Sequence, residues 1–427
     1  MENRNSTPTD RKVKIQIENL IKIYGKHPRQ ALKMFREGAS REKILNTTGN
    51  VLGVADVSMN VYQGELFVVM GLSGSGKSTL VRCINRLIPS TSGHIFVDDD
   101  NIPELSEEKL RELRRTKMTM VFQGFALFPH RTVVENVEYG LKVRKIDKEE
   151  RRQKAIETLE VVGLAQWADR FPSALSGGMQ QRVGLARALA TDADILLMDE
   201  AFGALDPLIR REMQDELVRL QNELHKTIVF ISHDIQEALK IGDRVAVMKD
   251  GYLVQVGTPE ELISQPADDY IRDFTADVNR AQVLKTGTIA RTTVPVILGR
   301  DSVQTAREQI ERNRMEYLYV VNRQGVPVGF VTPSTIEEAI EAGYDDVTQV
   351  MRKDFPTVRA ANTLEEVFHL YEKGMPLAVV DAEGKFKGAI EQSDVLSSIG
   401  RLSKSAEKDT SQANGAQPSE TGEEIAV

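Results

Sequence analysis

Short apolar runs recur along the first part of the chain and alternate with amphipathic stretches. Such runs, bounded by polar residues, predict buried strands. The runs are Leu66–Met70, Met118–Phe122, Ile195–Met198, Thr227–Ser232 and Val245–Met248. Between the third and fourth runs an amphipathic helix is predicted, because apolar residues recur at helical spacing, at Ile209, Met213, Leu217, Leu220 and Leu224. Residues 195–232 are therefore a predicted βαβ crossover, and residues 12 to about 265 a predicted α/β domain.

Two regions interrupt this alternation. Residues 26–50 are polar with helical spacing of their few apolar side chains, and residues 135–185 are helix-rich without strand signals. We place a helical subdomain inserted in the α/β core at about 125–185. Further along, Asp250-Gly251 predicts a hairpin turn, and Thr258-Pro259-Glu260-Glu261 predicts a helix that begins with a capping box. Residues 266–282 are expected to be a linker.

An internal repeat follows the predicted linker. Tyr317–Ile340 aligns without gaps to Pro376–Ile399, an offset of 59 residues (376 − 317). Each copy predicts a strand, a glycine turn, a second strand and a helix, with a further helix ahead of it near 302–312 and 363–372. We therefore expect two small α+β domains at 283–341 and 342–402. The ends, 1–11 and 403–427, are polar and are expected to be flexible and disordered, respectively.

Composition narrows the class of protein. The chain has 427 residues, a net charge of -8 and a pI of about 5.5. The sequence has no stripe of basic residues, which argues against a nucleic-acid partner. The one cysteine, Cys83, is expected to pack in a core, and a chain without disulfides suits a reducing compartment. No apolar run approaches the roughly 20 residues that span a bilayer, and no secretory signal is expected. A role at a membrane would therefore require docking to a separate membrane chain.

The segment Gly71-Leu72-Ser73-Gly74-Ser75-Gly76-Lys77-Ser78 lies between a predicted strand and a helix-like run, Thr79–Leu87. Glycines allow backbone N–H groups to wrap phosphates, and a helix N-terminus adds a favourable dipole. Lys77 would neutralise β- and γ-phosphate charge, and Ser78 would ligate Mg²⁺. The expected nucleotide-binding residues of this loop are Gly71, Ser73, Gly74, Ser75, Gly76, Lys77, Ser78 and Thr79.

Four polar residues follow other predicted strands. Asp199 is expected to complete the Mg²⁺ shell, and Glu200 to polarise an attacking water as general base. Gln123 could reach both the metal and the water, and His233 could hydrogen-bond the γ-phosphate. Taken singly, Gln123 would be a surface residue and His233 a satisfied loop histidine. Their combination with the phosphate loop favours a catalytic role for both.

A second anion site is predicted where Ser176-Gly177-Gly178 starts a helix. Two helix N-termini far apart in one domain cannot both hold one nucleotide. We therefore predict a head-to-tail homodimer, in which Ser176, Gly177 and Gly178 of one subunit close over the nucleotide of the other. The segment Ala204-Leu205-Asp206 is expected at the same seam.

These motifs resemble those of the ATP-binding subunits of ABC transporters. The resemblance covers roughly residues 12–265 and implies a P-loop NTPase fold with ATP and Mg²⁺ as cofactors. It implies that 71–78 is the Walker A loop, Gln123 the Q-loop, 175–179 the signature, 195–199 Walker B, Glu200 the catalytic carboxylate and His233 the H-loop. It also implies that Tyr24 stacks on adenine and that Asp206 belongs to the D-loop. One departure is Met179-Gln180, where the family has Gln directly after the second glycine.

A narrower resemblance involves the 26–50 insertion, the run Phe125–Arg131 and the C-terminal repeat. Together they resemble the glycine betaine and proline betaine (quaternary amine) uptake ATPases, and the repeat resembles a tandem pair of CBS domains. Such pairs often bind adenine nucleotides through a Thr and an Asp. The first copy has Thr332 but Thr335 in the acidic place, whereas the second has Glu391 and Asp394. A regulatory nucleotide, an electrostatic sensor and a ligand-free dimerisation module all remain open.

The resemblance implies an ATPase subunit that energises a bacterial importer of a quaternary amine such as glycine betaine, carnitine or proline betaine. Its implied partners are an integral membrane permease, contacted near 123–130 and the helical subdomain, and an extracytoplasmic substrate-binding protein. The implied location is the cytoplasmic face of the membrane. The alternatives are an importer ATPase for another small solute, an exporter ATPase, a soluble ABC ATPase of DNA repair or translation, and a regulatory protein with a dead site.

Overall fold

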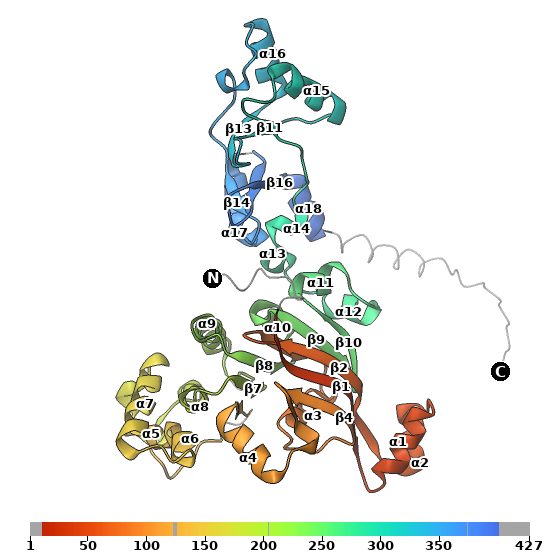
Figure 1. Cartoon of the computed structure of the whole chain (residues 1–427), viewed down its shortest axis with the longest axis vertical. Coiled ribbons are helices and arrows are strands. Elements are labelled where there is room, and N and C mark those ends of the chain that lie inside the picture. Colours follow the sequence, from red (N-terminus) through yellow and green to blue (C-terminus); the bar gives the residue numbers. More distant parts are fainter. Residues whose placement is uncertain (1–10, 123–125, 204, 374, 401–427) are drawn as a thin grey trace, which may run out of the picture. The chain divides into compact units, whose positions relative to one another are not determined.

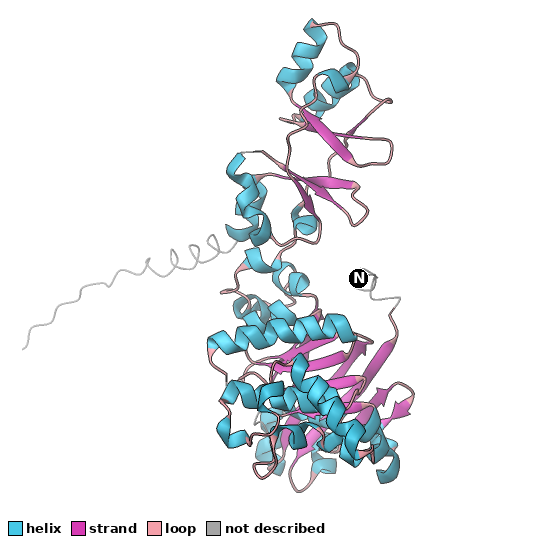
Figure 2. Ribbon diagram, turned by 90° about the vertical axis from the view of Figure 1, so that its left-hand side faces the viewer, coloured by secondary structure: helices cyan, strands magenta, loops and turns pink. Residues whose placement is uncertain are grey.

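The computed structural model describes residues 11–122, 126–203, 205–373 and 375–400 (Figures 1 and 2). They fall into two compact units, Met1–Thr275 and Ala276–Val427. Within the described residues no helix is both long enough and apolar enough to cross a membrane. Each unit is described below by itself.

A six-stranded sheet forms the centre of the first unit, in the order β10-β9-β3-β8-β7-β6. The strands β6, β7, β8, β3 and β9 run parallel, and β10 pairs with β9 in the antiparallel sense. Strands buried on both faces need continuous apolar runs, which explains why the sequence pattern located them. Their bounds are β3 Leu66–Met70, β6 Met118–Val121, β7 Ile195–Asp199, β8 Thr227–Ser232, β9 Arg244–Lys249 and β10 Tyr252–Gly257. The α/β fold class is confirmed.

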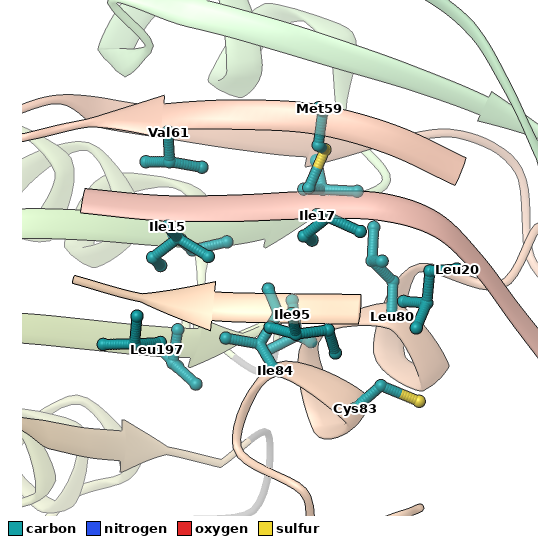
Figure 3. Packing of buried hydrophobic residues seen from close by; sticks show 14 of the residues in the cluster. Ile15, Ile17, Leu20, Met59, Val61, Leu80, Cys83, Ile84, Ile95 and Leu197 are labelled. Carbon is teal, nitrogen blue, oxygen red and sulfur yellow. The ribbon is translucent and has the colours of Figure 1, made fainter. Parts of the chain in front are cut away.

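A second, antiparallel sheet of four strands packs over the first, in the order β2-β1-β4-β5. Helix α3 (Lys77–Ile84) contributes to the core between the two sheets, where Leu80 and Ile84 meet Ile15 of β1 and Ile95 of β4 (Figure 3). Cys83 lies in the same core and is 2% exposed, so its predicted packing role is confirmed. The strand bounds are β1 Val13–Tyr24, β2 Val51–Tyr62, β4 Ser92–Val97 and β5 Asp100–Asn101.

Helices fill the two regions that interrupt the alternation. The insertion between β1 and β2 forms α1 (Pro28–Arg36) and α2 (Arg41–Thr48), which bury Ala31 and Ile44. The helix-rich region has an apolar core of its own that continues to Ala190, beyond the expected end at 185. Its helices are α5 Val133–Val137, α6 Tyr139–Val143, α7 Lys148–Val161 and α8 Gly177–Ala190. Two further helices, α4 (Glu107–Thr116) and α10 (Ile235–Ile241), flank the main sheet.

The predicted crossover helix is α9 (Pro207–Leu224). Met213, Leu217 and Leu220 are buried, whereas Ile209 is half-buried and Leu224 is 45% exposed. The apolar stripe therefore faces the sheet only over the middle of the helix.

The first unit ends later than the sequence suggests. Both Asp250 (φ 53°) and Gly251 (φ 90°) have positive φ, as a two-residue hairpin requires, and Thr258 and Glu261 form the predicted capping box of α11 (Pro259–Ser264). The expected linker, 266–282, instead contains α12 (Asp269–Phe274) and α13 (Arg280–Val283). Helix α12 belongs to the first unit because its Ile271 is fully buried there.

The second unit consists of two copies of one supersecondary plan. Strands β12 (Leu318–Val321) and β13 (Pro327–Val331) precede α16 (Pro333–Glu341), and β15 (Leu377–Val380) and β16 (Phe386–Ile390) precede α18 (Gln392–Gly400). Each element begins 59 residues after its counterpart, for example 377 − 318, which is the offset of the sequence repeat. The remaining elements are α14 Thr286–Ile289, β11 Val296–Ile297, α15 Val303–Asn313, β14 Thr357–Arg359 and α17 Leu364–Val367.

The two copies exchange backbone pairs. Arg291, ahead of the first copy, bridges Ala389 of β16, and Arg352, ahead of the second, bridges Phe330 of β13. A Cβ on Gly388 would lie 2.3 Å from the Arg291 carbonyl oxygen. The repeated glycine therefore permits a backbone approach that a side chain would block.

The buried thiol gives a direct test of the core. Burial raises the pKa of Cys83 to about 12, and a thiol rather than a thiolate reacts poorly. We expect Ellman's reagent at pH 8 to leave the native chain unlabelled and to label one thiol per chain in urea. Labelling of the native chain at the rate of a free cysteine would contradict this packing.

Candidate functional site

The proposed phosphate loop connects β3 to α3 at the carboxyl end of the parallel strands. The last residue of β3, Met70, pairs with Ser232 of β8, and Asp199 of β7 pairs with Ile231. The residues that follow these strands are Gly71, Glu200 and His233, so the sheet register brings three of the sequence motifs to one edge. Open α/β sheets place their ligands at this edge.

Two glycines of the loop are required by close backbone approaches. A Cβ on Gly71 (φ 145°) would lie 2.1 Å from the Met248 carbonyl oxygen, and one on Gly76 (φ 98°) would lie 2.3 Å from that of Gly53. Gly74 has open space around it but a φ of 78°, which disfavours a side chain for conformational reasons. Ser73 and Gly74 are exposed at the loop, while Ser75 is buried and its hydroxyl makes no hydrogen bond within the described residues.

Lys77 is the buried cation of the loop. Its side chain is only 4% exposed, and its ammonium donates to the carbonyl oxygens of Gly71 (2.8 Å) and Leu72 (3.0 Å). Burial lowers the pKa of Lys77, and the carboxylates of Glu200 and Asp199 counter this by favouring the charged form. A cation held by neutral carbonyls in a buried position is well suited to receive an anion.

The first oxygen cluster joins α3 to β7. The Ser78 hydroxyl donates to one Asp199 oxygen (2.8 Å), and the Arg82 guanidinium contacts the other (3.0 Å). Hydroxyl and carboxylate oxygens are suitable Mg²⁺ ligands, but two such groups fill only part of an octahedral shell. In the described part of the chain no group of three or more His, Cys, Asp or Glu could hold a metal. The residues fit a hard cation whose other ligands are phosphate and water oxygens.

Glu200 adopts the left-handed backbone conformation, with φ 48°. Such a conformation is costly for a residue with a side chain and often occurs at functional sites. One carboxylate oxygen of Glu200 lies 3.6 Å from Nδ1 of His233, whose side chain is 57% exposed, while that of Glu200 is 20% exposed. The pair therefore sits at the open side of the loop.

Tyr24 lies at the end of β1, beside the start of α3. Its hydroxyl is 3.1 Å from the Thr79 hydroxyl, and its ring lies over Gly53, where a Cβ would approach a ring carbon to 2.8 Å. The ring is 37% exposed, and the Lys22 ammonium lies 5.0 Å from its centre. An exposed aromatic face next to the phosphate loop is suited to stacking on a base.

The predicted second anion site stands apart from the loop in its contacts. Ser176 caps α8, where its hydroxyl accepts from the Met179 N–H (3.4 Å), and Asp206 caps α9. The two caps adjoin, because a Cβ on Gly178 would lie 2.7 Å from Ile209. Among the described residues no hydrogen bond or ion pair joins 176–178 to 71–78.

Two predicted site residues, Gln123 and Ala204, lie outside the described residues. Conversely, Arg82, which pairs with Asp199, is not among the residues predicted for the site. Arg82 follows Ser78 by four positions on α3, so helical spacing could have indicated that the two side chains share a face.

In the second unit the paired positions of the repeat have equivalent backbone roles, but they are neutral in the first copy and acidic in the second. Thr335 accepts from the Thr332 N–H, and Asp394 accepts from the Glu391 N–H, each over 2.9 Å. At these positions, among the described residues, only the second copy forms ion pairs: Arg291 contacts Asp394 (2.5 Å) and Glu391 (3.9 Å). A cavity of about 430 Å³ lies between the copies, with Arg352, Thr332, Tyr317 and Tyr371 in its wall. Burial raises the pKa of both tyrosines, so their hydroxyls stay neutral.

Comparison with protein families agrees with this geometry. Residues 54–203 match the ABC transporter family, and residues 287–342 and 347–401 each match the CBS domain family. The two matches to the CBS family cover the two copies of the repeat.

Several relatives align with most of the chain. The glycine betaine transport ATP-binding protein OpuAA of Bacillus subtilis is 45% identical over 391 residues, which are 91% of this chain and 93% of that protein. The glycine betaine/proline betaine transport system ATP-binding protein ProV of Escherichia coli is 46% identical over 396 residues, 91% and 98% of the two chains. The trimethylamine N-oxide transport system ATP-binding protein TmoW of Ruegeria pomeroyi is 51% identical over 305 residues, 70% and 89%.

A solved structure supports the fold of the first unit. The protein cbiO1 from Clostridium perfringens, part of the ABC transporter complex cbiONQ, superposes with a TM-score of 0.51 and 27% identity. The superposition covers 64% of this chain and 98% of that one. With its phosphate loop, its strand-end carboxylates and its CBS pair, the chain belongs to the family of ABC transporter ATP-binding proteins.

Proposed function

We propose that this chain hydrolyses ATP to drive an ABC importer of a quaternary amine such as glycine betaine, carnitine or proline betaine. The observation that carries the ATPase part is the buried Lys77 ammonium, held by two loop carbonyls and facing Asp199 and Glu200. A triphosphate in the loop would replace those carbonyls as the partner of the ammonium. The solute rests on the names of relatives such as OpuAA and ProV.

The loop residues would divide the work of binding. The N–H groups of residues 71–78 and the N-terminus of α3 would hold the phosphates, with Lys77 at the β- and γ-phosphates. Mg²⁺, held by Ser78 and Asp199, would offset charge on the phosphate oxygens. The exposed ring of Tyr24 would stack on adenine.

Hydrolysis would use the groups at the strand ends. Glu200 would accept a proton from the attacking water while the water oxygen bonds the γ-phosphorus and the bond to ADP breaks. His233, 3.6 Å from Glu200, would hydrogen-bond the γ-phosphate and hold the water in line. We also assign Gln123 to this water and the metal, on sequence grounds alone.

A homodimer would complete the nucleotide site. Among the described residues, no hydrogen bond or ion pair joins Ser176, Gly177 and Gly178 to the loop of their own chain, yet the α8 N-terminus at which they lie is suited to an anion. A second copy in the head-to-tail sense would place this end over the γ-phosphate, with Asp206 at the same seam. Formation of the seam would then depend on ATP.

The membrane partner would be a separate permease, with an extracytoplasmic binding protein that supplies the solute. Near the proposed contact, the Arg131 guanidinium lies 4.8 Å from the Phe128 ring and 4.7 Å from the Tyr139 ring. An aromatic and cationic surface of this kind suits a protein interface. This arrangement would place the chain at the cytoplasmic face of the membrane.

An importer of another small solute is the main alternative, because relatives include a trimethylamine N-oxide system.

Two variants test the ATPase proposal. Lys77→Ala should weaken ATP binding by about 10–100-fold, since hydrogen bonds to a charged group contribute roughly 1.5–3 kcal/mol. Glu200→Gln should keep ATP affinity, lower kcat by about 10²–10⁴-fold and accumulate an ATP-bound dimer. Equilibrium binding and size-exclusion chromatography with ATP measure both. Unchanged affinity in the first variant, or a monomer in the second, would contradict the assignment.

The solute is tested by uptake. In cells lacking other betaine uptake, this chain together with its permease and binding protein should accumulate labelled glycine betaine, and the Lys77→Ala version should not. Competition by unlabelled carnitine, proline betaine, choline and trimethylamine N-oxide would rank the solutes. Uptake of none of these amines would favour another solute.

We further propose that the second unit is regulatory and that its cavity binds one anion-bearing nucleotide. The two bridging arginines have equivalent places in the repeat, but the acidic pair of the second copy neutralises Arg291. At the first copy the equivalent positions are Thr332 and Thr335, and among the described residues Arg352 makes no ion pair. Arg352 and Thr332 both line the cavity, whose wall also contains Glu316 and Glu391. A phosphate is a suitable partner for a guanidinium in that setting.

The repeat supplies its own control for this proposal. Calorimetric titration of AMP into the full chain should give binding that Arg352→Gln weakens about tenfold or more, as expected for loss of a charged hydrogen bond. Arg291→Gln should leave binding within about twofold. Equal losses of affinity in both variants would indicate an effect on folding. If AMP, ADP and a cyclic dinucleotide all fail to bind in a Lys77→Ala background, a ligand-free module would be favoured.

A further inference from the structure

The hairpin turn between β9 and β10, formed by Lys249, Asp250 and Gly251, lies directly against the phosphate loop. The Gly251 N–H donates to the Ser75 carbonyl oxygen (3.1 Å), and the Gly251 carbonyl accepts from the Ala55 N–H (2.9 Å). A Cβ on Gly76 would lie 3.5 Å from the Gly251 Cα. The turn is therefore bonded to the middle of the loop and leaves it little room to shift.

The insertion formed by α1 and α2 contacts this turn. Arg41, the first residue of α2, contacts the Asp250 carboxylate at 3.0 Å. Phe35 of α1 lies near Tyr252, the first residue of β10, with ring centres 6.4 Å apart. The insertion also begins just after Tyr24, so one element adjoins both the proposed base-stacking ring and the support of the phosphate loop.

Helix α12 also contacts the turn. The Lys249 ammonium lies 4.4 Å from the centre of the Tyr270 ring, which stacks on Phe274. The Tyr270 hydroxyl is buried and makes no hydrogen bond of normal geometry within the described residues. Burial raises the pKa of Tyr270. The side chain thus reaches from the last helix of the first unit to the turn that supports the loop.

We propose that the Lys249–Gly251 turn sets the conformation of the phosphate loop and that Arg41 and Tyr270 are positioning residues that hold it there. The inference rests on the proposed ATP site. It adds a turn that supports the phosphate loop through residues that are not proposed to contact the nucleotide. Backbone amides bind phosphate well only when they converge on it, so a small displacement of Ser75 weakens binding without removing a ligand contact. Since the second unit begins directly after α12, at Ala276, tension on that helix would reach the loop through Tyr270.

The test separates positioning from folding in the full-length chain. Arg41→Gln should raise the KM for ATP about threefold with kcat within about twofold, as expected for loss of an exposed ion pair. Arg41→Lys should restore most of the affinity. The matched control is Arg36→Gln. Arg36 lies on the same insertion but donates a hydrogen bond to Ser92 instead of contacting the turn, so this variant should leave the KM for ATP unchanged.

Two substitutions at Tyr270 separate the ring from the hydroxyl. Tyr270→Phe removes a buried hydroxyl that has no hydrogen-bond partner among the described residues and keeps the ring that faces Lys249, so the Tm should stay the same or rise and the KM for ATP should not change. Tyr270→Leu removes the ring and should raise the KM for ATP by about threefold or more, the range of a lost cation–π contact.

Salt provides an independent readout. Exposed ion pairs are screened, so the KM of the native chain should rise between about 50 mM and 500 mM KCl, and Arg41→Gln should lose part of that rise. The proposal is overturned if Arg41→Gln and Tyr270→Leu both leave the KM and its salt dependence unchanged. It is also overturned if every change in KM follows a fall in Tm. A native chain without ATPase activity would instead refute the proposed function.

Discussion

The buried ammonium of Lys77 is the group around which the first unit is organised. A cation removed from water is costly unless opposite charge or hydrogen bonds replace the lost solvation. Here the replacement comes from two carbonyls of its own loop and from carboxylates at the end of β7. The glycines allow the loop to fold back far enough to present those carbonyls, and the parallel sheet holds β3 and β7 in the register that aligns the charges.

Short stretches of sequence predicted the individual elements of this arrangement. They did not predict which elements that are distant in the sequence would pair. The buried strands, the hairpin turn and the capping box of α11 each follow from a few consecutive residues, and so does the 59-residue repeat. The antiparallel sheet of β1, β2, β4 and β5 depends on partners far apart in sequence, and it was not predicted. Helix α12 was taken for linker because one buried apolar residue, Ile271, gives too weak a pattern in so short a helix.

The candidate site divides in the same way. The loop residues and the strand-end carboxylates were predicted because strand, turn and helix are contiguous there. Contacts between motifs were not: Arg82 reaches Asp199 across 117 residues, and Arg41 reaches Asp250 across 209. Helical spacing places Arg82 on the same face as Ser78, but its partner on β7, like the partner of Arg41, is set only once the sheets are assembled. Gln123 and Ala204, which lie outside the described residues, remain sequence predictions.

The reciprocal bridges of the second unit have a consequence for how the repeat can be inherited and engineered. Each copy completes its sheet with backbone that belongs to the other: Arg291 serves β16 and Arg352 serves β13. A chain cut after the first copy would leave β13 as an open edge, with the unpaired N–H and C=O groups that promote aggregation. The pair is thus a single cooperative module that must be duplicated, moved or lost whole. One copy alone would expose a strand edge that the other copy normally covers.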